Sequence, residues 1–360
     1  MKNIFKVVGM MSGTSLDGLD IAYCEFRYED EKWTFKLWDA VVKRYPAALA
    51  KKIAEAQNMN ASDFMLLDVE LGRFFGRSVK KFVDDKKITA DFIASHGHTI
   101  FHQPKLGLTT QIGSGVAIQA EAGLPVVFDF RSLDVLLGGQ GAPLVPIGDK
   151  LLFADYDICL NLGGIANLSA DVKGKRRAFD VCFCNMPLNL LMNTVGKEFD
   201  RGGQRASEGE VDLTLLNEIR ALYRSWRKKR PSLGREMFEK SFLPILRKRK
   251  KLSLEDRLAT CVEATAIEIV DAAKETGGRS MLCTGGGAFN SYLISRILHH
   301  SDDNISIIVP DEEIVKFKEA LVFAFLGVLR VRGENNCLAS VTGASRDNSG
   351  GVVTGLIPIA

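Results

Sequence analysis

The stretch Y-D-I-C-L-N-L-G-G-I-A-N-L-S-A-D-V-K-G-K-R-R-A-F-D (156–180) decides the fold. Its short apolar runs predict three consecutive strands, because glycine-containing turns separate them. The strands are expected at Tyr156–Leu162, Asn167–Val172 and Arg176–Phe179. A meander of strands therefore starts near residue 156.

The beginning of the chain carries the same order of elements. Ile4–Met11 is a nearly continuous apolar run, typical of a buried strand, and Ser12–Gly18 has the composition of a turn. Leu19–Phe26 predicts a second strand, and the strictly alternating Lys32–Leu37 predicts a third. The two meanders lie about 150 residues apart, which indicates an internal duplication.

The remaining pattern alternates helices with strands, which favours an α/β fold whose sheets are covered by helices. Helices are expected at Pro46–Gln57, Ser62–Asp85, Gly115–Ala122, Glu255–Thr276 and Glu312–Arg332, and another opens at Ala288. Further strands are expected at Phe92–Ser95, Pro125–Phe130, Met281–Thr284 and Ile305–Val309. The length of 360 residues suggests about two domains. We expect them at 1–130 and 131–360, with a charged helical insertion near 201–258, and leave open whether the C-terminal tail packs on the first domain.

The composition is that of an ordinary globular protein, with 46% hydrophobic and 25% charged residues. It excludes a disordered chain, a collagen-like fibre and a small disulfide scaffold. No stretch approaches the roughly 20 apolar residues of a membrane helix, and the N-terminal residues lack the features of a signal peptide. The 7 scattered cysteines predict a reducing, cytoplasmic location without a disulfide framework.

Two groups of residues raise the question of a nucleic-acid partner or a bound metal ion, but neither group predicts one. The basic runs R-S-W-R-K-K-R (224–230) and R-K-R-K-K (247–251) are expected to be solvated helical faces, and the net charge of +3 does not indicate a nucleic-acid binder. Cys182 with Cys184, and the histidines at 96, 98 and 102, have too few neighbouring ligands to predict a metal site.

Three glycine-rich turns, each preceded by an apolar strand, carry the predicted chemistry: M-S-G-T-S-L-D-G (11–18), N-L-G-G-I-A-N (161–167) and C-T-G-G-G-A-F-N (283–290). Glycine lets the backbone approach a phosphate closely, so that its N–H groups act as donors. Hydroxyls such as Thr14 and Ser15 add donors, and Asp17 is suited to hold a hydrated Mg²⁺. Neither a Walker A loop nor a Rossmann fingerprint is present. The arrangement suggests a two-domain nucleotide clamp of the actin and sugar-kinase kind.

The motifs, taken in order, resemble the anhydro-N-acetylmuramic acid kinase family over nearly the whole chain. They are M-S-G-T-S-L-D-G-L-D (11–20), S-H-G-H-T-I-F-H-Q-P (95–104), T-Q-I-G (110–113), P-V-V-F-D-F-R-S-L-D (125–134), G-G-Q-G-A-P-L-V-P (138–146), N-L-G-G-I-A-N (161–167), F-D (179–180), G-G-G-A-F-N (285–290), E-A (319–320) and V-T-G-A (341–344). The resemblance implies two actin-like (ribonuclease H-like) domains with an ATP cleft between them, and a homodimer. It also implies that MgATP and water open the 1,6-anhydro bridge of anhydro-N-acetylmuramic acid with phosphorylation of O6, in peptidoglycan recycling.

The resemblance also assigns site residues. Asp180 is expected to be the catalytic base, since the attacking water must lose a proton to a carboxylate within reach. The sugar-binding residues are expected to be Thr99, Arg131, Glu319 and His98, where Arg131 can bind a carboxylate or phosphate with its planar fork. The ATP-binding residues are expected to be Gly13, Thr14, Ser15, Leu16, Asp17, Gly18, Leu19, Asp20, Gly163, Gly164, Asn167, Gly285, Gly286 and Gly287. No tightly bound metal is expected beyond the Mg²⁺ that accompanies ATP.

The chain departs from the family pattern next to the expected base. After Asp180 the family pattern resembles T-G-P-G-N, whereas this chain has V-C-F-C-N (181–185). His98 replaces a glutamine, and Asn193 stands where an aspartate is expected. These changes leave three hypotheses open: a variant with the same substrate, a kinase for a different sugar or anhydro-sugar, and a silent regulator that binds ATP or muropeptides.

Overall fold

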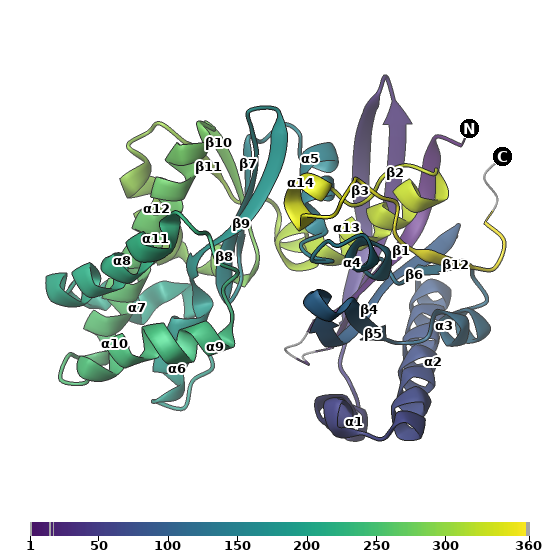
Figure 1. Cartoon of the computed structure of the whole chain (residues 1–360), viewed down its shortest axis with the longest axis horizontal. Helices are drawn as coiled ribbons and strands as arrows, with labels where there is room; N and C mark the ends of the chain where they lie inside the picture. Colours follow the sequence, from purple (N-terminus) through teal and green to yellow (C-terminus); the bar gives the residue numbers. More distant parts are fainter. Residues whose placement is uncertain (1, 14–15, 17, 358–360) are drawn as a thin grey trace. The chain divides into compact units, whose positions relative to one another are not determined.

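The computed structural model describes residues 2–13, 16 and 18–357. The chain folds into two compact units, Met1–Leu152 with Phe317–Ala360, and Phe153–Lys316 (Figure 1). The first unit therefore extends past the boundary expected at residue 130, and residues 317–360 belong to it rather than to the second domain. The reason is α5 (Val145–Leu152), which contacts β3, and whose Gly148 lies directly against Val322.

The first unit contains a seven-stranded sheet in the order β12-β6-β4-β1-β2-β3, with β5 paired to β4. Neighbours β1, β2 and β3 are antiparallel, whereas β4 runs parallel to β1, and β6 runs parallel to β4. The strands are β1 (Ile4–Ser12), β2 (Leu19–Glu29), β3 (Lys32–Lys43), β4 (Phe92–Gln103), β5 (Leu108–Ile112), β6 (Val126–Phe128) and β12 (Val352–Thr354).

The second unit repeats this topology in a five-stranded sheet, β11-β10-β7-β8-β9. Its first three strands in sequence are antiparallel, and β10 and β11 continue the sheet in parallel. The strands are β7 (Ile158–Leu162), β8 (Ile165–Val172), β9 (Lys175–Phe183), β10 (Ser280–Thr284) and β11 (Ser306–Ile308). The order β9-β8-β7-β10-β11 corresponds to β3-β2-β1-β4-β6, so the predicted duplication and the actin-like α/β fold are confirmed.

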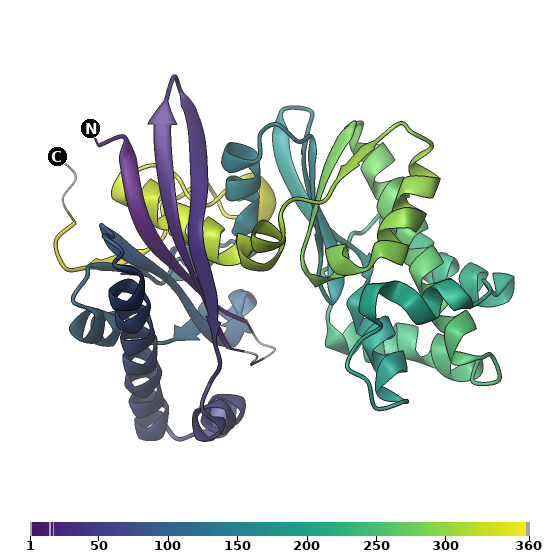
Figure 2. The same ribbon diagram turned by 180° about the vertical axis from the view of Figure 1, so that it is seen from behind.

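Helices cover both faces of the first sheet (Figure 2). Val8 and Met10 of β1 belong to the same core cluster as Leu71 of α2, whereas Gly9 faces α13. A Cβ atom at Gly9 would lie 2.1 Å from the carbonyl oxygen of Ala320, so the helix can approach only a glycine there. The helical elements are α1 (Ala47–Glu55), η1 (Ala56–Asn58), α2 (Ala61–Lys86), η2 (Pro104–Leu106), α3 (Gly115–Ala122), α4 (Ser132–Leu136), α13 (Glu312–Val331) and α14 (Ala339–Thr342).

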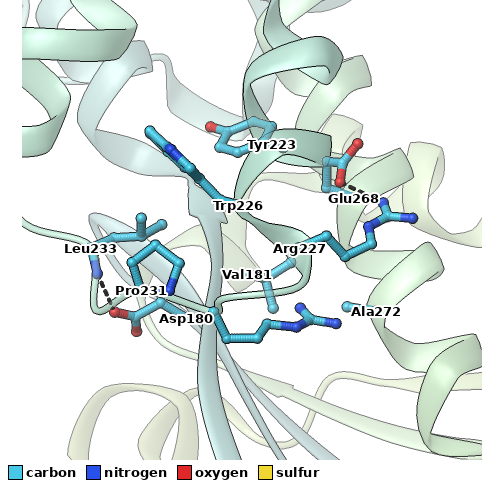
Figure 3. Close-up of a pocket in the computed structure, with 10 residues that line it drawn as sticks. Asp180, Val181, Tyr223, Trp226, Arg227, Pro231, Leu233, Glu268 and Ala272 are labelled. Atoms are coloured by element: carbon cyan, nitrogen blue, oxygen red, sulfur yellow. Dashed lines mark hydrogen bonds and ion pairs between the residues drawn. The ribbon is translucent and has the colours of Figure 1, made fainter.

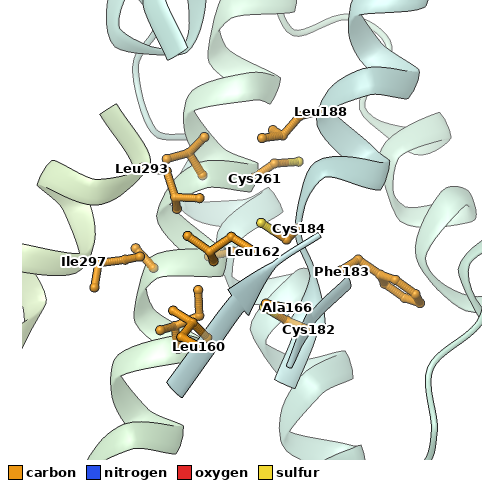
Figure 4. Close-up of a cluster of buried hydrophobic side chains, with 14 of the residues drawn as sticks. Leu160, Leu162, Ala166, Cys182, Phe183, Cys184, Leu188, Cys261, Leu293 and Ile297 are labelled. Atoms are coloured by element: carbon orange, nitrogen blue, oxygen red, sulfur yellow. The ribbon is translucent and has the colours of Figure 1, made fainter. Parts of the chain in front are cut away.

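The core of the second unit forms around α11 (Leu254–Thr276), which contacts β8 and β9. Figure 4 shows Leu160 and Leu162 of β7 beside Cys182, Cys184 and Cys261 in this core. The expected insertion near 201–258 consists of short helices. The helical elements of this unit are α6 (Asn185–Asn193), η3 (Arg201–Gly203), α7 (Gln204–Glu208), α8 (Leu213–Arg227), α9 (Arg235–Met237), η4 (Phe238–Phe242), α10 (Leu243–Lys248), η5 (Gly286–Phe289) and α12 (Ser291–Ser301).

Some helix starts differ from the predicted ones because other residues cap them. The α2 helix begins at Ala61, since the Asn60 side chain accepts the N–H of Asp63 at 3.0 Å. The helix expected to open at Ala288 begins at Ser291, where Asn290 caps it by accepting the N–H of Leu293 at 2.9 Å. Residues 286–289 form a 3₁₀ turn instead.

Candidate active site

Two of the predicted glycine turns lie together in the second unit. Strands β7 and β10 are parallel neighbours, so the turns that follow them leave the same edge of the sheet. A Cβ atom at Gly285 would lie 2.4 Å from Oδ1 of Asn161, and one at Gly287 would lie 2.7 Å from Cβ of Leu162. Gly285 also has φ of +81°, which favours glycine. Both positions thus require glycine for the two turns to pack.

The helix α6 begins directly against the first of these turns. Backbone N–H groups of Cys184 and Asn185 donate to the carbonyl oxygens of Gly164 and Gly163 at 2.9 and 3.1 Å. The Asn185 side chain donates to the carbonyl oxygen of Leu162 at 3.0 Å. The structure thus brings Asn161 and Asn185 to the turns, and neither is among the predicted ATP-binding residues. Both belong to quoted motifs, with Asn161 near the end of β7 and Asn185 just after β9.

The backbone of the turns remains open for a ligand. Gly164 and Gly286 are exposed. A Cβ atom at either position would meet only one neighbouring group within 4 Å among the described residues, at 3.8 and 3.9 Å. Exposed glycine backbone at the end of parallel strands is the kind of surface that receives phosphate groups. The geometry therefore fits an anion such as a nucleotide phosphate.

Asp180 lies in the same sheet, on β9. Its backbone pairs with Asn167 of β8, which in turn pairs with Asn161 of β7, so the three polar residues form a row across three strands. The carboxylate is half-buried, and its Oδ2 accepts the N–H of Leu233 at 2.8 Å (Figure 3). Burial raises the pKa of Asp180, and the hydrogen bond from Leu233 acts in the opposite direction.

The unusual residues after Asp180 are part of the core. Strand β9 continues to Phe183, and the side chains of Cys182, Phe183 and Cys184 have no exposed surface. Phe183 packs against four aromatic rings, those of Tyr223, Trp226, Phe238 and Phe242. Burial raises the pKa of Cys184 to about 12, so this thiol stays protonated. Cys182, Phe183 and Cys184 therefore fill the interior, whereas Val181 is half-buried and lines the pocket beside Asp180.

The loop between β1 and β2 holds the first glycine-rich motif, and Thr14, Ser15 and Asp17 lie outside the described residues. The N–H of Leu16 donates to the carbonyl oxygen of Gly13 at 3.3 Å, with Leu16 at φ of +61°. A Cβ atom at Gly18 would lie 2.7 Å from the carbonyl oxygen of Lys43. Leu19 and Asp20 begin β2. Gly18 thus lies tightly against the end of β3, just before β2 begins.

Arg131 is held in a fixed orientation in the first unit. Its Nε and Nη2 donate to Nε2 of His96 at 3.0 and 2.8 Å, and its Nη1 donates to the carbonyl oxygen of Gly141 at 2.7 Å. Neither Asp129 nor Asp134 is its hydrogen-bond partner. Desolvation lowers the pKa of Arg131 to about 10, which still leaves the guanidinium charged at neutral pH.

His98 is buried, with 4% of its surface exposed, and its Nδ1 lies 2.7 Å from Oγ of Ser12. Ser12 Oγ also lies 2.6 Å from the Tyr45 hydroxyl, so His98 supports the end of β1. Burial lowers the pKa of His98, which favours the neutral ring. The third histidine of the segment, His102, contacts Thr109 at 3.1 Å. Within the described residues, no cluster of three potential metal ligands occurs.

Thr99 and Glu319 also belong to the first unit. Thr99 is half-buried on β4, next to His98. Glu319 is exposed on α13, yet the surrounding protein raises the pKa of its carboxyl by desolvation, while the charges of Arg131 and Lys318 oppose this shift. Arg131 and Glu319 therefore form an oppositely charged pair of groups within interaction range. Asp180 and the two described glycine turns belong to the second unit.

A protein-family model and two curated relatives match the chain along nearly its whole length. The family model described as "Anhydro-N-acetylmuramic acid kinase" matches residues 5–355. The protein named anhydro-N-acetylmuramic acid kinase from Francisella tularensis subsp. novicida is 35% identical over 364 residues, covering 94% of this chain and 95% of that protein. Its namesake from Sulfurimonas denitrificans is 31% identical, covering 96% and 98%. Over the described residues, the structure contains no helix of the length and hydropathy that a membrane span requires.

Proposed function

We propose that this chain, which belongs to the anhydro-N-acetylmuramic acid kinase family, uses ATP and water to convert 1,6-anhydro-N-acetylmuramic acid into N-acetylmuramic acid 6-phosphate and ADP. The observation that carries the proposal is the family match together with the position of Asp180, on the sheet whose two glycine turns share one edge. The reaction belongs to the recycling of peptidoglycan. We place it in the cytoplasm, where ATP is available.

Asp180 acts as the base in this proposal. Water attacks the anomeric carbon while its proton passes to the Asp180 carboxylate, and the bond between that carbon and the bridge oxygen breaks. The bridge oxygen stays on C6 and attacks the γ-phosphorus of ATP, whose bond to the β-phosphate oxygen breaks to release ADP. Burial, which raises the pKa of Asp180, makes it a stronger base than an exposed aspartate.

The glycine turns are proposed to bind the ATP phosphates. Gly164 and Gly286 are exposed and Gly163 and Gly285 are partly exposed, so a phosphate can approach their backbone, with Asn167 beside them on β8. Gly287 is buried and is proposed to act by letting the two turns pack together. The β1–β2 loop supplies the other proposed contacts, from Gly13 to Asp20. Mg²⁺ would enter with ATP and neutralise phosphate charge, and Asp17 is the carboxylate of that loop suited to hold its hydrated form.

The proposed sugar-binding residues lie in the first unit. Arg131 presents a charged, oriented guanidinium that suits the lactyl carboxylate, and Glu319 and Thr99 can accept or donate hydrogen bonds to sugar hydroxyls. His98 is proposed to act on the sugar site through its contact with Ser12. We further propose a homodimer, as the family resemblance implies.

A different substrate gains no support from the altered 181–185 segment. Its three central side chains are buried in the core and offer no contacts to a ligand, so Val181, which is half-buried and lines the pocket beside Asp180, is the substituted residue left to affect the substrate. A silent regulator is also disfavoured, because Asp180 and the glycine turns are retained.

The proposed reaction is tested by incubating the protein with MgATP and 1,6-anhydro-N-acetylmuramic acid in H₂¹⁸O. We expect ADP release that depends on the sugar, with ¹⁸O in the C1 hydroxyl of the product and none in its phosphate group. N-acetylmuramic acid, which has no bridge to open, serves as the control. Release of ADP at the same rate with and without sugar would contradict the proposal. Equal turnover of 1,6-anhydroglucose would indicate the kinase for a different anhydro-sugar.

A further inference from the structure

We infer that the backbone N–H of Leu233 is a positioning group for Asp180: it holds Oδ2 of the carboxylate, so that Oδ1 is the atom that receives the proton of the attacking water. This inference rests on the proposed function, in which Asp180 is the base. It adds the 228–234 segment, defined here as the strap between α8 and α9, to the machinery of the reaction.

The strap contacts Asp180 through its backbone. The N–H of Leu233 donates to Oδ2 at 2.8 Å, and in the part of the chain that the structure describes this is the one hydrogen bond recorded for the carboxylate. Figure 3 shows Pro231 and Leu233 lying beside Asp180. The Leu233 side chain is buried, with 8% of its surface exposed, and the contact with the carboxylate is made by the backbone alone.

The strap is also anchored to the residue before Asp180. The guanidinium of Arg230 lies 4.0 Å from the centre of the Phe179 ring and forms an ion pair with Glu275 of α11. The backbone N–H of Arg230 donates to the carbonyl oxygen of Trp226, at the end of α8, at 2.8 Å. The strap therefore contacts β9 at two consecutive residues, Phe179 and Asp180. These contacts keep the Leu233 N–H at one place relative to the strand.

The other ionisable groups that line the same pocket do not take this role. Arg227 donates hydrogen bonds to Glu268 and Asp271 of α11 at 2.7 and 2.9 Å, so the charges of these three groups neutralise one another. Arg230 is paired with Glu275. Burial raises the pKa of Tyr223 well above its usual range, so its hydroxyl stays neutral. The hydrogen bond from Leu233 is thus the contact that sets the orientation of Asp180.

The inference is tested with two substitutions at one position. Leu233→Pro removes the N–H, whereas Leu233→Ala keeps it and removes most of the side chain. Loss of the hydrogen bond raises the pKa of Asp180, so we expect the acidic limb of the kcat/KM profile to move up by about 0.5 to 1 pH unit in Leu233→Pro. We also expect kcat to fall about tenfold, the effect of losing one hydrogen bond to a charged group. In Leu233→Ala, the acidic limb of the kcat/KM profile should stay at the wild-type pH.

A readout without turnover separates this inference from the proposed function. The Asp180 carboxyl is followed by ¹³C NMR titration of protein labelled at aspartate, with its signal assigned by its loss in Asp180→Asn. A raised pKa in Leu233→Pro but not in Leu233→Ala supports the contact even if the wild type proves inactive on the sugar, which would overturn the proposed function alone. Unchanged titration and an unmoved acidic limb in Leu233→Pro would overturn the inference, as would a higher kcat.

Arg230→Lys provides a second variant if Leu233→Pro does not fold. It keeps the positive charge but loses the planar contact with Phe179, which loosens the strap. A smaller shift of the acidic limb in the same direction supports the inference, and a profile identical to that of the wild type contradicts it.

Discussion

The neutral imidazole of His96 orients the guanidinium of Arg131. Its Nδ1 lies 2.9 Å from the carbonyl oxygen of Gly97, which can only accept, so the proton is on Nδ1 and the lone pair is on Nε2. That lone pair receives two N–H groups of Arg131. Burial, first, and the charge of Arg131 lower the pKa of His96 well below its usual value, which keeps the acceptor available.

Replacement of His96 should therefore weaken sugar binding. In His96→Phe an aromatic ring is kept but the acceptor is lost, and we expect the KM for the sugar to rise about tenfold or more, since bonds to a charged group contribute about 1.5 to 3 kcal/mol each. The kcat should change less. His96→Gln, which keeps an acceptor, should recover part of the loss, and His102→Phe on the same strand serves as the control. A KM equal to that of the wild type would refute this role.

The roles of single residues could be predicted only where a motif carried them. From motifs, the sequence predicts roles for Asp180, Arg131 and the glycines of the turns, and these roles stay predictions, while the positions of the residues follow from the strands around them. It did not identify Leu233, because a backbone N–H acts here and any residue other than proline supplies one. Nor did it predict that residues 182–184 are core, since that depends on aromatic side chains more than 35 residues away in sequence, such as Tyr223.

At the scale of elements, Asp134 connects three segments of the first unit. Its carboxylate is fully buried and accepts the N–H of Gly141 at 2.8 Å. It also accepts hydrogen bonds from Cys337, Thr342 and Asn348 at 3.0, 2.8 and 2.9 Å. The C-terminal tail is thereby tied to the loop after α4, whose Gly141 carbonyl holds Arg131.

Asp134→Asn should destabilise the protein strongly. The amide replaces one carboxylate oxygen with a donor that faces other donors, so we expect a loss of about 2 to 4 kcal/mol in the free energy of unfolding. Asp129→Asn is the matched control, because Asp129 is half-buried and accepts bonds only from Ser132 among the described residues. Urea unfolding of both variants measures the difference. Equal stabilities would contradict the role given to Asp134.

In the second unit, Glu263 joins α11 to α12. Arg296 donates two bonds to its carboxylate at 2.6 and 3.0 Å, and His300 lies 2.8 Å away. Burial by itself raises the pKa of Glu263, but Arg296 and His300 outweigh it, so the net pKa is below the ordinary value of 4.5. A lowered pKa in the folded state means that the carboxylate stabilises the fold above pH 4.5, and that this stability is lost as the pH falls below it.

Glu263→Gln should accordingly remove part of the pH dependence of stability. We expect the variant to be less stable than the wild type near neutral pH, and the difference in their free energies of unfolding to narrow as the pH falls below 4.5. Urea unfolding at several pH values measures both curves. Parallel curves over this range would show that Glu263 does not contribute in this way.

Helices and strands with a clear hydrophobic periodicity were predicted better than elements that form only by pairing with residues far away in the sequence. Strand β3 extends to Lys43, beyond the alternating run that ends at Leu37, because it is an edge strand that pairs with β2 along its whole length. The tail strand β12 was not predicted. It is three residues long and depends on pairing with β6, more than 200 residues earlier in the chain.

At the scale of the whole molecule, one topology occurs twice, and each unit has its own core. The expected domain boundary differs from the observed division because α5 and the C-terminal residues pack with the first unit. Three arginines of the basic runs form ion pairs within the second unit. Arg227 and Arg230 pair with acidic residues of α11, and Arg249 pairs with Glu218 at 2.5 Å.

The second unit is one continuous segment, so we expect residues 153–316 to fold alone. The expressed fragment should show helical circular dichroism and a single cooperative unfolding transition in urea. Its buried core around α11 lies entirely within this range. A fragment that unfolds without cooperativity would mean that this core depends on the rest of the chain.

The most direct measurement is the rate of sugar-dependent ADP release by the wild type and by Asp180→Asn, with Asp155→Asn, an exposed aspartate of the same unit, as the control. We predict turnover with 1,6-anhydro-N-acetylmuramic acid in the wild type and in Asp155→Asn, and a loss of at least about 10²-fold in Asp180→Asn, as expected for a general base. Turnover that survives in Asp180→Asn would contradict the role of Asp180. A wild type that binds ATP but never turns over the sugar would contradict the proposed kinase activity itself.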